Sequence, residues 1–312
     1  MDQKFYHISI LPEACLDALR ISPNGVYVDA TLGGAGHSLR IASQLTTGRL
    51  ICIDRDDEAI QNAYTRLAPV WDRVTIVKSD FREIDRVLAG QALPGADGIL
   101  FDLGVSSPQL DHAERGFSYM QDAPLDMRMD QQQALTAYDV VNSWSREELR
   151  RILFEYGEER YAPLIAAAIE RERAASPIRS TLALAELIRS AMPAKALREK
   201  QHPAKRSFQA IRIAVNDELS ALREAMDKAI DALNPGGRLA VITFHSLEDR
   251  IVKTAFQAAA KGCTCPKDFP VCVCGQKPKV RLPCRRPVLP DAQEIMDNPR
   301  ARSAKLRICE RV

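Results

Sequence analysis

The sequence predicts an α/β fold, a parallel sheet with flanking helices, interrupted by an inserted all-helical domain. Short apolar runs alternate with helical segments up to residue 111 and again after residue 206, which is the pattern of β-α units. Between these regions apolar residues keep a helical spacing for roughly a hundred residues. We therefore expect residues 1–111 and 207–312 to form one domain and residues 112–206 to form the insertion.

The composition is that of a globular protein with an ordinary core. Of 312 residues, 46% are hydrophobic and 27% are charged, with a net charge of +2 that implies nothing about nucleic acid. Basic residues nevertheless cluster late, since every charged residue between Gln276 and Pro287 is basic. No apolar run approaches the length of a membrane span, and the N-terminus lacks a signal pattern. We expect a cytoplasmic protein with no membrane contact.

The first two predicted strands enclose a glycine-rich loop. The strand at 26–29 leads into residues 31–37, which open a helix near Ser38, and the strand at 49–54 ends on Asp54. Glycines allow the backbone to approach a ligand, and an acid about twenty residues later suits a ribose hydroxyl. A glycine loop alone is weak evidence. Together with both strands and Asp54, it predicts a nucleotide-binding βαβ unit.

The third predicted strand, 74–77, leads to Asp80 and Phe81. An acid and an aromatic ring at a strand end suit an adenine base. A helix cap and a core phenylalanine explain the same two residues equally well.

The fourth predicted strand, at 98–101, ends on Asp102 and opens into a loop that contains Ser106, Ser107, Pro108 and Gln109. In open α/β sheets the ligand crevice lies beyond the carboxyl ends of the strands. We expect the reaction centre here.

The insertion and the chain after it supply further candidates. Helices are predicted at 146–156, 161–173 and 182–192, followed by the basic run 195–206, which is either a solvated loop or a phosphate-contacting surface. One long amphipathic helix is predicted from Phe208 to Leu233. The strand at 238–244 then delivers His245, which would act on a base or a proton, or make a structural hydrogen bond.

Four of the eight cysteines form two Cys-x-Cys pairs, listed as Cys263, Cys265, Cys272 and Cys274. A tetrahedral zinc site and free or redox-active thiols both remain open, because the spacing differs from that of common zinc knuckles. Disulfides are the weaker alternative in a reducing compartment. No metal ligand is assigned from the sequence.

The Asp102 loop suits transfer to an exocyclic amine of a base. Such an amine is a poor nucleophile because its lone pair is delocalised into the ring. Acceptors such as the Asp102 carboxylate, the Ser107 hydroxyl and a backbone carbonyl would hold its hydrogens and stabilise the developing positive charge. Pro108 restrains Ser107 to an extended backbone that aims this carbonyl. Positioning would then suffice, with no covalent enzyme intermediate.

Several long motifs resemble those of the bacterial ribosomal small-subunit RNA methyltransferase H family, also called MraW. They span essentially the whole chain: DATLGGAGH (29–37), DLGVSSPQLD (102–111), ERGFS (114–118), PLDMRMD (124–130), YGEER (156–160), RSFQAIR (206–212), FHSLEDR (244–250) and NPRARS (298–303).

The resemblance implies a Rossmann-like, S-adenosylmethionine-dependent methyltransferase sheet with a helical substrate-recognition insertion. It also implies direct methylation of the N4 amine of one decoding-centre cytosine in 16S rRNA, within the small ribosomal subunit. The catalytic residues would be Asp102, Ser107, Pro108 and His245. The cofactor contacts would be Gly34, Ala35, Gly36, His37, Asp54, Phe81, Asp102 and Gln109. Ala35 stands where a glycine is expected, so the approach of the cofactor's methionine part is in question there.

Two other functions compete with this interpretation. A nicotinamide-dependent oxidoreductase would also use the glycine loop and Asp54, but it leaves the Ser-Ser-Pro-Gln turn unexplained. A non-catalytic ribosome-assembly factor would use the basic patches, but the complete loop from Asp102 to Gln109 argues against it. The sequence leaves the oligomeric state open, with a homodimer as one alternative.

Overall fold

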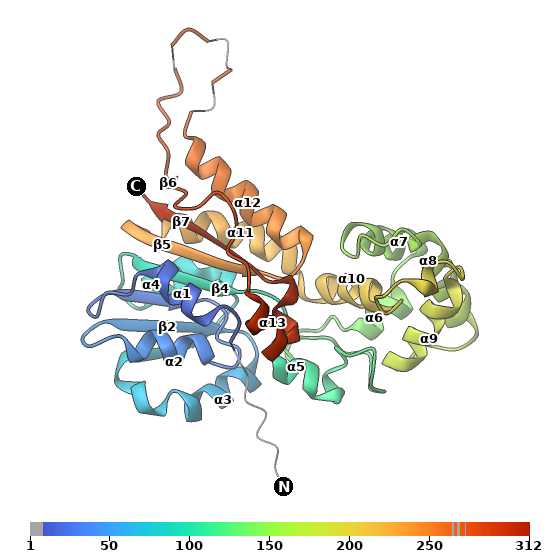
Figure 1. Cartoon of the computed structure of the whole chain (residues 1–312). Helices are drawn as coiled ribbons and strands as arrows, with labels where there is room; N and C mark the ends of the chain where they lie inside the picture. The colour runs from blue at the N-terminus through green and yellow to red at the C-terminus, as the bar shows by residue number, and fades with distance from the viewer. Residues whose placement is uncertain (1–8, 264, 267–268, 272) are drawn as a thin grey trace. The chain divides into compact units, whose positions relative to one another are not determined.

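The computed structural model describes residues 9–263, 265–266, 269–271 and 273–312, with Ser107 described by its backbone alone. The chain forms two compact units, which are treated separately below (Figure 1). Unit 1 comprises Met1–Gly104 and Leu219–Val312, and unit 2 comprises Val105–Glu218. Residues 105–111 and 207–218 therefore group with the helical insertion. The division into functional domains stays a prediction.

Unit 1 is built on a seven-stranded sheet in the order β3-β2-β1-β4-β5-β7-β6. The first five strands in this order are parallel, whereas β7 runs antiparallel to both β5 and β6. The strands are β1 (Val26–Asp29), β2 (Arg49–Asp54), β3 (Val74–Lys78), β4 (Ala96–Asp102), β5 (Leu233–Thr243), β6 (Val280–Arg281) and β7 (Lys305–Arg311). A Rossmann-like α/β fold is thus confirmed, although its sheet is mixed rather than wholly parallel.

Helices cover both faces of this sheet because its strands are apolar on both sides. Alternate residues enter two separate clusters, one with Tyr27, Leu50 and Leu100, the other with Val28, Ile51 and Ile99. The first cluster packs α1 (Pro12–Leu19), α2 (Gly36–Ser43) and α3 (Asp57–Arg66). The second packs α4 (Ile84–Gly90), α11 (Glu218–Asp231) and α12 (Ser246–Lys261). A short helix, α13 (Ala292–Asp297), precedes β7.

Two predicted elements differ from the structure. The helix predicted from Phe208 to Leu233 is two helices, α10 (Lys205–Asn216) and α11, because Asp217 between them adopts a left-handed backbone with φ 50°. Strand β5 begins at Leu233 rather than Arg238 and runs through the Pro-Gly-Gly turn, with a register shift against β4 between Ala96 and Gly98. Both differences arise from backbone packing that the local pattern does not encode.

Unit 2 is helical and packs around its own apolar cluster, which includes Leu149, Ile165 and Ile211. Its helices are α5 (Ser107–Asp111), α6 (Ala137–Ser143), α7 (Arg146–Glu155), α8 (Ala162–Ala175), α9 (Thr181–Ala191) and α10. Side-chain caps start several of them, as Ser145 and Glu148 do in the predicted capping box at α7. Within the described residues, no helix is both long and apolar enough to cross a membrane.

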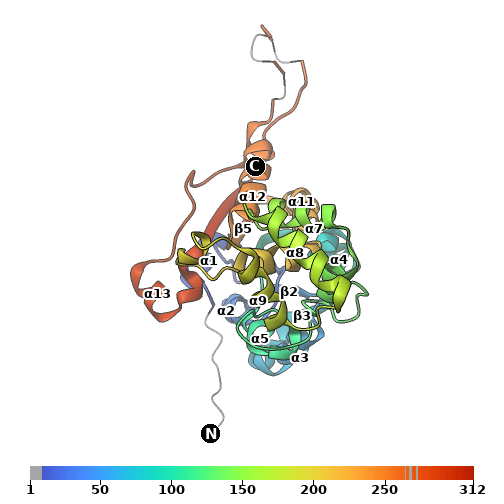
Figure 2. The ribbon, with the colours of Figure 1, turned by 90° about the vertical axis from the view of Figure 1, so that its right-hand side faces the viewer.

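In unit 1 the chain between α12 and β6 extends away from the sheet in both views (Figure 1, Figure 2). The described residues from Gly262 to Lys279 are all exposed or half-buried, and burial begins again at Val280. This segment contains the paired cysteines.

Candidate functional site

The strand order of unit 1 reverses between β1 and β4, which places the ligand crevice at their carboxyl ends. Asp29 ends β1 and is buried, and its carboxylate accepts hydrogen bonds from the Ser38 hydroxyl and the Thr31 N–H. The Thr31 hydroxyl accepts the N–H of Asp102 at 2.6 Å. The loop after β1 and the end of β4 are therefore held together.

The glycine-rich loop needs left-handed backbone at two positions. Gly33 has φ 46°, and Ala35, which forms the N-cap of α2, has φ 57°. A left-handed backbone costs a non-glycine residue about 1–2 kcal/mol, which is why a glycine is expected at the position of Ala35. Gly36 has no room for a side chain, since a Cβ would lie 2.0 Å from the Ser9 hydroxyl. The Arg66 guanidinium donates to the Gly34 carbonyl, a contact that no sequence motif indicated.

Asp54 lies at the end of β2, beside this loop. Its carboxylate accepts the N–H groups of Gly33 at 2.7 Å and Asp56 at 2.9 Å. Burial outweighs these donors and raises the pKa of Asp54 to about 6. Each carboxylate oxygen has two lone pairs, so Asp54 retains acceptor capacity for ribose hydroxyls.

Asp102 and His37 form a pair at the end of β4. The Nε2 atom of His37 lies 3.6 Å from Oδ2 of Asp102, and His37 is buried. Burial by itself would lower the pKa of His37, but the Asp102 carboxylate outweighs it and the pKa is raised. Oδ1 of Asp102 and Nε2 of His37 are buried with no hydrogen-bond partner among the described residues. Unpartnered buried polar atoms are uncommon and indicate a place for a polar ligand.

At the end of β3, Asp80 caps a short 3₁₀ helix by accepting the Arg82 N–H at 2.9 Å. Phe81 is half-buried and packs edge-on against Phe101, with ring centroids 5.6 Å apart. Both features match the cap-and-core alternative. The partly exposed ring leaves contact with an adenine as a prediction.

His245 follows β5 at the same edge of the sheet and forms the N-cap of α12. Its Nδ1 accepts the Glu248 N–H at 3.4 Å, and its Nε2 lies 3.0 Å from the Glu248 carboxylate. The structural alternative therefore accounts for Nδ1, whereas Nε2 is buried with no hydrogen-bond partner among the described residues. Its catalytic role remains a prediction.

Ser107, Pro108 and Gln109 belong to unit 2 and begin α5. The Ser106 hydroxyl accepts the Gln109 N–H, and the Gln109 side-chain carbonyl accepts the Ser106 N–H at 3.0 Å. Gln109 is buried, and its side-chain carbonyl is used by this cap. The extended backbone predicted for Ser107 is wrong, because Ser107 is the first residue of α5 and the extended residue is the N-cap Ser106. The side chain of Ser107 lies outside the described part of the chain, so the role of its hydroxyl stays a prediction.

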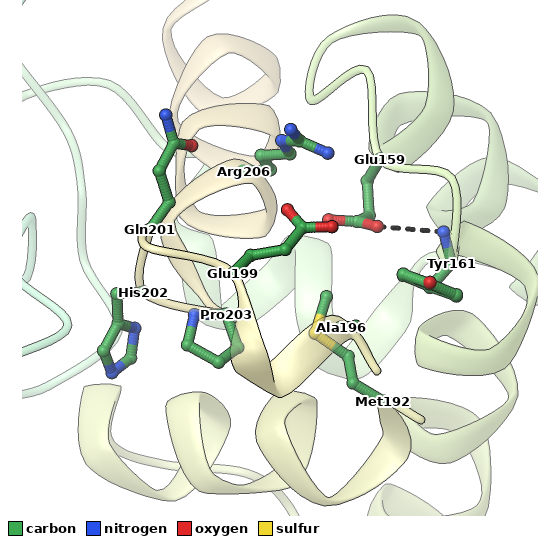
Figure 3. Close-up of a pocket in the computed structure, with 9 residues that line it drawn as sticks. All are labelled: Glu159, Tyr161, Met192, Ala196, Glu199, Gln201, His202, Pro203 and Arg206. Carbon is green, nitrogen blue, oxygen red and sulfur yellow. Dashed lines mark hydrogen bonds between the residues drawn. The ribbon is translucent and has the colours of Figure 1, made fainter. Parts of the chain in front are cut away.

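Unit 2 also contains a pocket that sequence patterns did not identify as a site (Figure 3). It is open to solvent on one side and is lined in part by residues of the basic run 195–206. The carboxylates of Glu159 and Glu199 point toward each other in it, and Glu159 is buried and accepts the Tyr161 N–H at 2.9 Å. The lining residues are Glu159, Tyr161, Met192, Ala196, Glu199, Gln201, His202, Pro203 and Arg206. The signal available in the sequence was the Tyr-Gly-Glu-Glu-Arg motif.

Comparison with known proteins decides the family. A model of the MraW methylase family matches residues 4–312. The chain belongs to this family. It is 58% identical to the ribosomal RNA small subunit methyltransferase H of a Paenibacillus species, covering 99% of this chain and all of that one. It is 57% identical to the protein of that name from Brevibacillus brevis, over 99% and 98% of the two chains.

A solved rRNA methylase from Streptococcus thermophilus overlays on 96% of this chain and 93% of its own, with a TM-score of 0.43 and 11% identity. The assignment rests on the family match rather than on this overlay. As a member of this methylase family, the chain uses S-adenosylmethionine as its methyl donor. The residue roles at the sheet edge remain predictions.

Proposed function

We propose that this protein methylates the exocyclic N4 amine of a decoding-centre cytosine in 16S rRNA, by direct transfer from S-adenosylmethionine. The curated relatives are named small-subunit rRNA methyltransferases, which supports ribosomal RNA as the substrate class. The observation that carries the chemistry is the pairing of half-buried Asp102 with buried His37, whose unpartnered oxygen and nitrogen atoms lie at the sheet edge.

The donor set of this edge fits the cofactor. Asp54 offers acceptors for the ribose hydroxyls, and the open face of Phe81 suits the adenine ring. The loop from Gly34 to His37 would hold the methionine part, and Ala35 supplies the left-handed turn for which glycine is the usual residue. When bound, S-adenosylmethionine would supply an electrophilic methyl group on its sulfonium sulfur, which leaves as a neutral thioether.

Asp102 is the residue best placed to activate the amine. A cytosine N4 amine carries two hydrogens and gains positive charge as its nitrogen forms the new bond. The free Oδ1 of Asp102 accepts one hydrogen, which concentrates electron density on the nitrogen and stabilises that charge. The amine must lose one proton after transfer, and the Asp102 carboxylate is a base that can accept it. The Nε2 atom of His37 lies 3.6 Å from the other carboxylate oxygen, so a protonated His37 stabilises the ionised form of Asp102 electrostatically.

The deciding experiment is methyl transfer from radiolabelled S-adenosylmethionine to small ribosomal subunits that lack the modification, followed by nucleoside analysis. Label in N4-methylcytidine is expected. Label in another nucleoside would refute the proposed target atom while keeping the rRNA methyltransferase activity. Cofactor binding without any label would favour the assembly-factor function. Naked 16S rRNA serves as the comparison substrate, and we expect it to be methylated less than the assembled subunit.

A further inference from the structure

The loop between α12 and β6 brings three cysteine thiols together. The Sγ atoms of Cys263, Cys265 and Cys274 all lie within 4.8 Å of one another, and those of Cys263 and Cys274 are 3.8 Å apart. All three residues are half-buried and are not in disulfides. They lie in the extended segment beyond α12 and take no part in the sheet-edge site (Figure 1).

The spacing of these sulfurs suits a metal better than a disulfide. In a tetrahedral zinc site with Zn–S bonds of about 2.3 Å, two sulfurs lie roughly 3.8 Å apart. A disulfide requires about 2.05 Å. Thiolate ligands also select soft or borderline ions over Mg²⁺ and Ca²⁺. We propose that Cys263, Cys265 and Cys274 are ligands of a structural Zn²⁺ ion.

The surroundings of the thiols support this proposal. The N–H of Val273 points to Sγ of Cys265 at 3.4 Å, and such a bond stabilises the negative charge of a thiolate. Val273 is 73% exposed, so packing of its side chain in a core does not explain this hydrogen bond.

The described residues of the loop bury no side chain that could stabilise its fold. Its two ends meet where Gly262, at φ 65°, approaches Pro278 so closely that a Cβ would lie 2.5 Å from the Pro278 nitrogen. The Lys279 N–H donates to the Ala259 carbonyl at 2.8 Å and closes the base. Beyond this base the described apolar side chains are exposed, including Phe269 at 50% and Val271 at 70%. Zinc supplies folding free energy to segments that lack a core.

A fourth protein ligand is available in the sequence. Cys272 stands two residues before Cys274, but it lies outside the described residues and the proposal does not depend on its position. Substituting it tells whether the ion has three or four cysteine ligands.

The test uses the full-length protein, purified without chelators and with zinc in the growth medium. Elemental analysis should find about one zinc per chain, and cobalt substitution should give thiolate charge-transfer absorption and the intense visible bands of a tetrahedral site. Cys263→Ser, Cys265→Ser and Cys274→Ser should each lose most of the zinc. Cys284→Ser is the matched control, because Cys284 is a half-buried cysteine outside the cluster, and it should keep the metal.

Three results would overturn the proposal: zinc far below one per chain after incubation with the ion, iron or copper in its place, or a Cys263–Cys274 disulfide in the native protein by mass spectrometry. Circular dichroism of the variants shows whether the sheet still folds. Metal content is read independently of methyl transfer, so failure of the proposed rRNA activity leaves this test intact.

Discussion

The sheet edge of unit 1 and the cysteine loop beyond α12 hold their functional side chains in opposite ways. At the sheet edge, Asp29 and His37 are buried, and the N–H of Asp102 is fixed by the Thr31 hydroxyl. In the cysteine loop no described residue between Gly262 and Lys279 is buried. Burial and hydrogen bonds therefore organise the first site before any ligand arrives. The second depends on a ligand for its order.

The largest effect expected concerns Asp102. Asp102→Ala removes the unpartnered carboxylate oxygen and should lower methyl transfer to small subunits by roughly 10²–10⁴-fold. The fold should persist, because the Asp102 backbone N–H still bonds Thr31. Asp72→Asn is the control, since Asp72 is 68% exposed, and it should keep full activity. Full activity in Asp102→Ala would remove this residue from the mechanism.

The next prediction concerns the stability of the sheet, in which Arg238 of β5 forms an ion pair with Glu310 of β7. Both residues are buried, and the guanidinium donates to Glu310 at 2.9 Å and to the Ala18 carbonyl at 3.1 Å. Glu310→Ala leaves a buried cation without its partner and should lower the free energy of unfolding by about 3–5 kcal/mol. Urea denaturation measures this change.

An exposed ion pair provides the contrast. Glu155→Ala breaks the pair with Arg151, in which both side chains are about half exposed, and should leave the urea midpoint unchanged within error. An equal decrease in the free energy of unfolding for Glu310→Ala and Glu155→Ala would contradict the expectation that the buried pair of Arg238 and Glu310 stabilises the fold more than the exposed pair does.

A smaller effect is expected from pH at Asp54. Its pKa is raised from 3.8 to about 6, so the folded chain binds a proton more readily than the unfolded chain between these values. Asp54 therefore makes the unliganded protein less stable as pH rises through this window. A ribose bound to the ionised carboxylate gains affinity over the same rise. S-adenosylhomocysteine should bind about tenfold more weakly near pH 5 than near pH 7 by calorimetry.

Asp54→Asn isolates the titrating group. The variant should bind S-adenosylhomocysteine more weakly than the wild type at neutral pH, and its affinity should no longer follow the Asp54 titration. A wild-type affinity that stays constant between these pH values would rule out ionised Asp54 as the ribose contact.

The smallest effect on global stability is expected from removal of metal from the cysteine loop. A chelator should leave the urea midpoint nearly unchanged, because the described loop residues contribute no buried side chain to either sheet cluster. Hydrogen exchange should increase within residues 262–279 and stay constant in β1 and β4. An equal increase of exchange in β1 and β4 would mean that the order of the sheet edge, like that of the cysteine loop, depends on the metal.

The local pattern determined much of unit 1. The strands at 26–29 and 49–54 were predicted with the bounds that β1 and β2 have, because buried parallel strands are uninterrupted apolar runs. Asp54 and Asp102 could be placed at strand ends for the same reason. The long motifs were sufficient to indicate the MraW methylase family, which the family match confirms.

Only the tertiary structure decided which of these residues meet. The pairing of His37 with Asp102 and the contact of Arg66 with Gly34 join residues far apart in sequence, so no local pattern encodes them. Asp217 separates α10 from α11 through a left-handed backbone that the continuous apolar pattern did not indicate. The cysteine spacing left a metal and free thiols open. The closure of the chain at Gly262 and Pro278 brought the three sulfurs together.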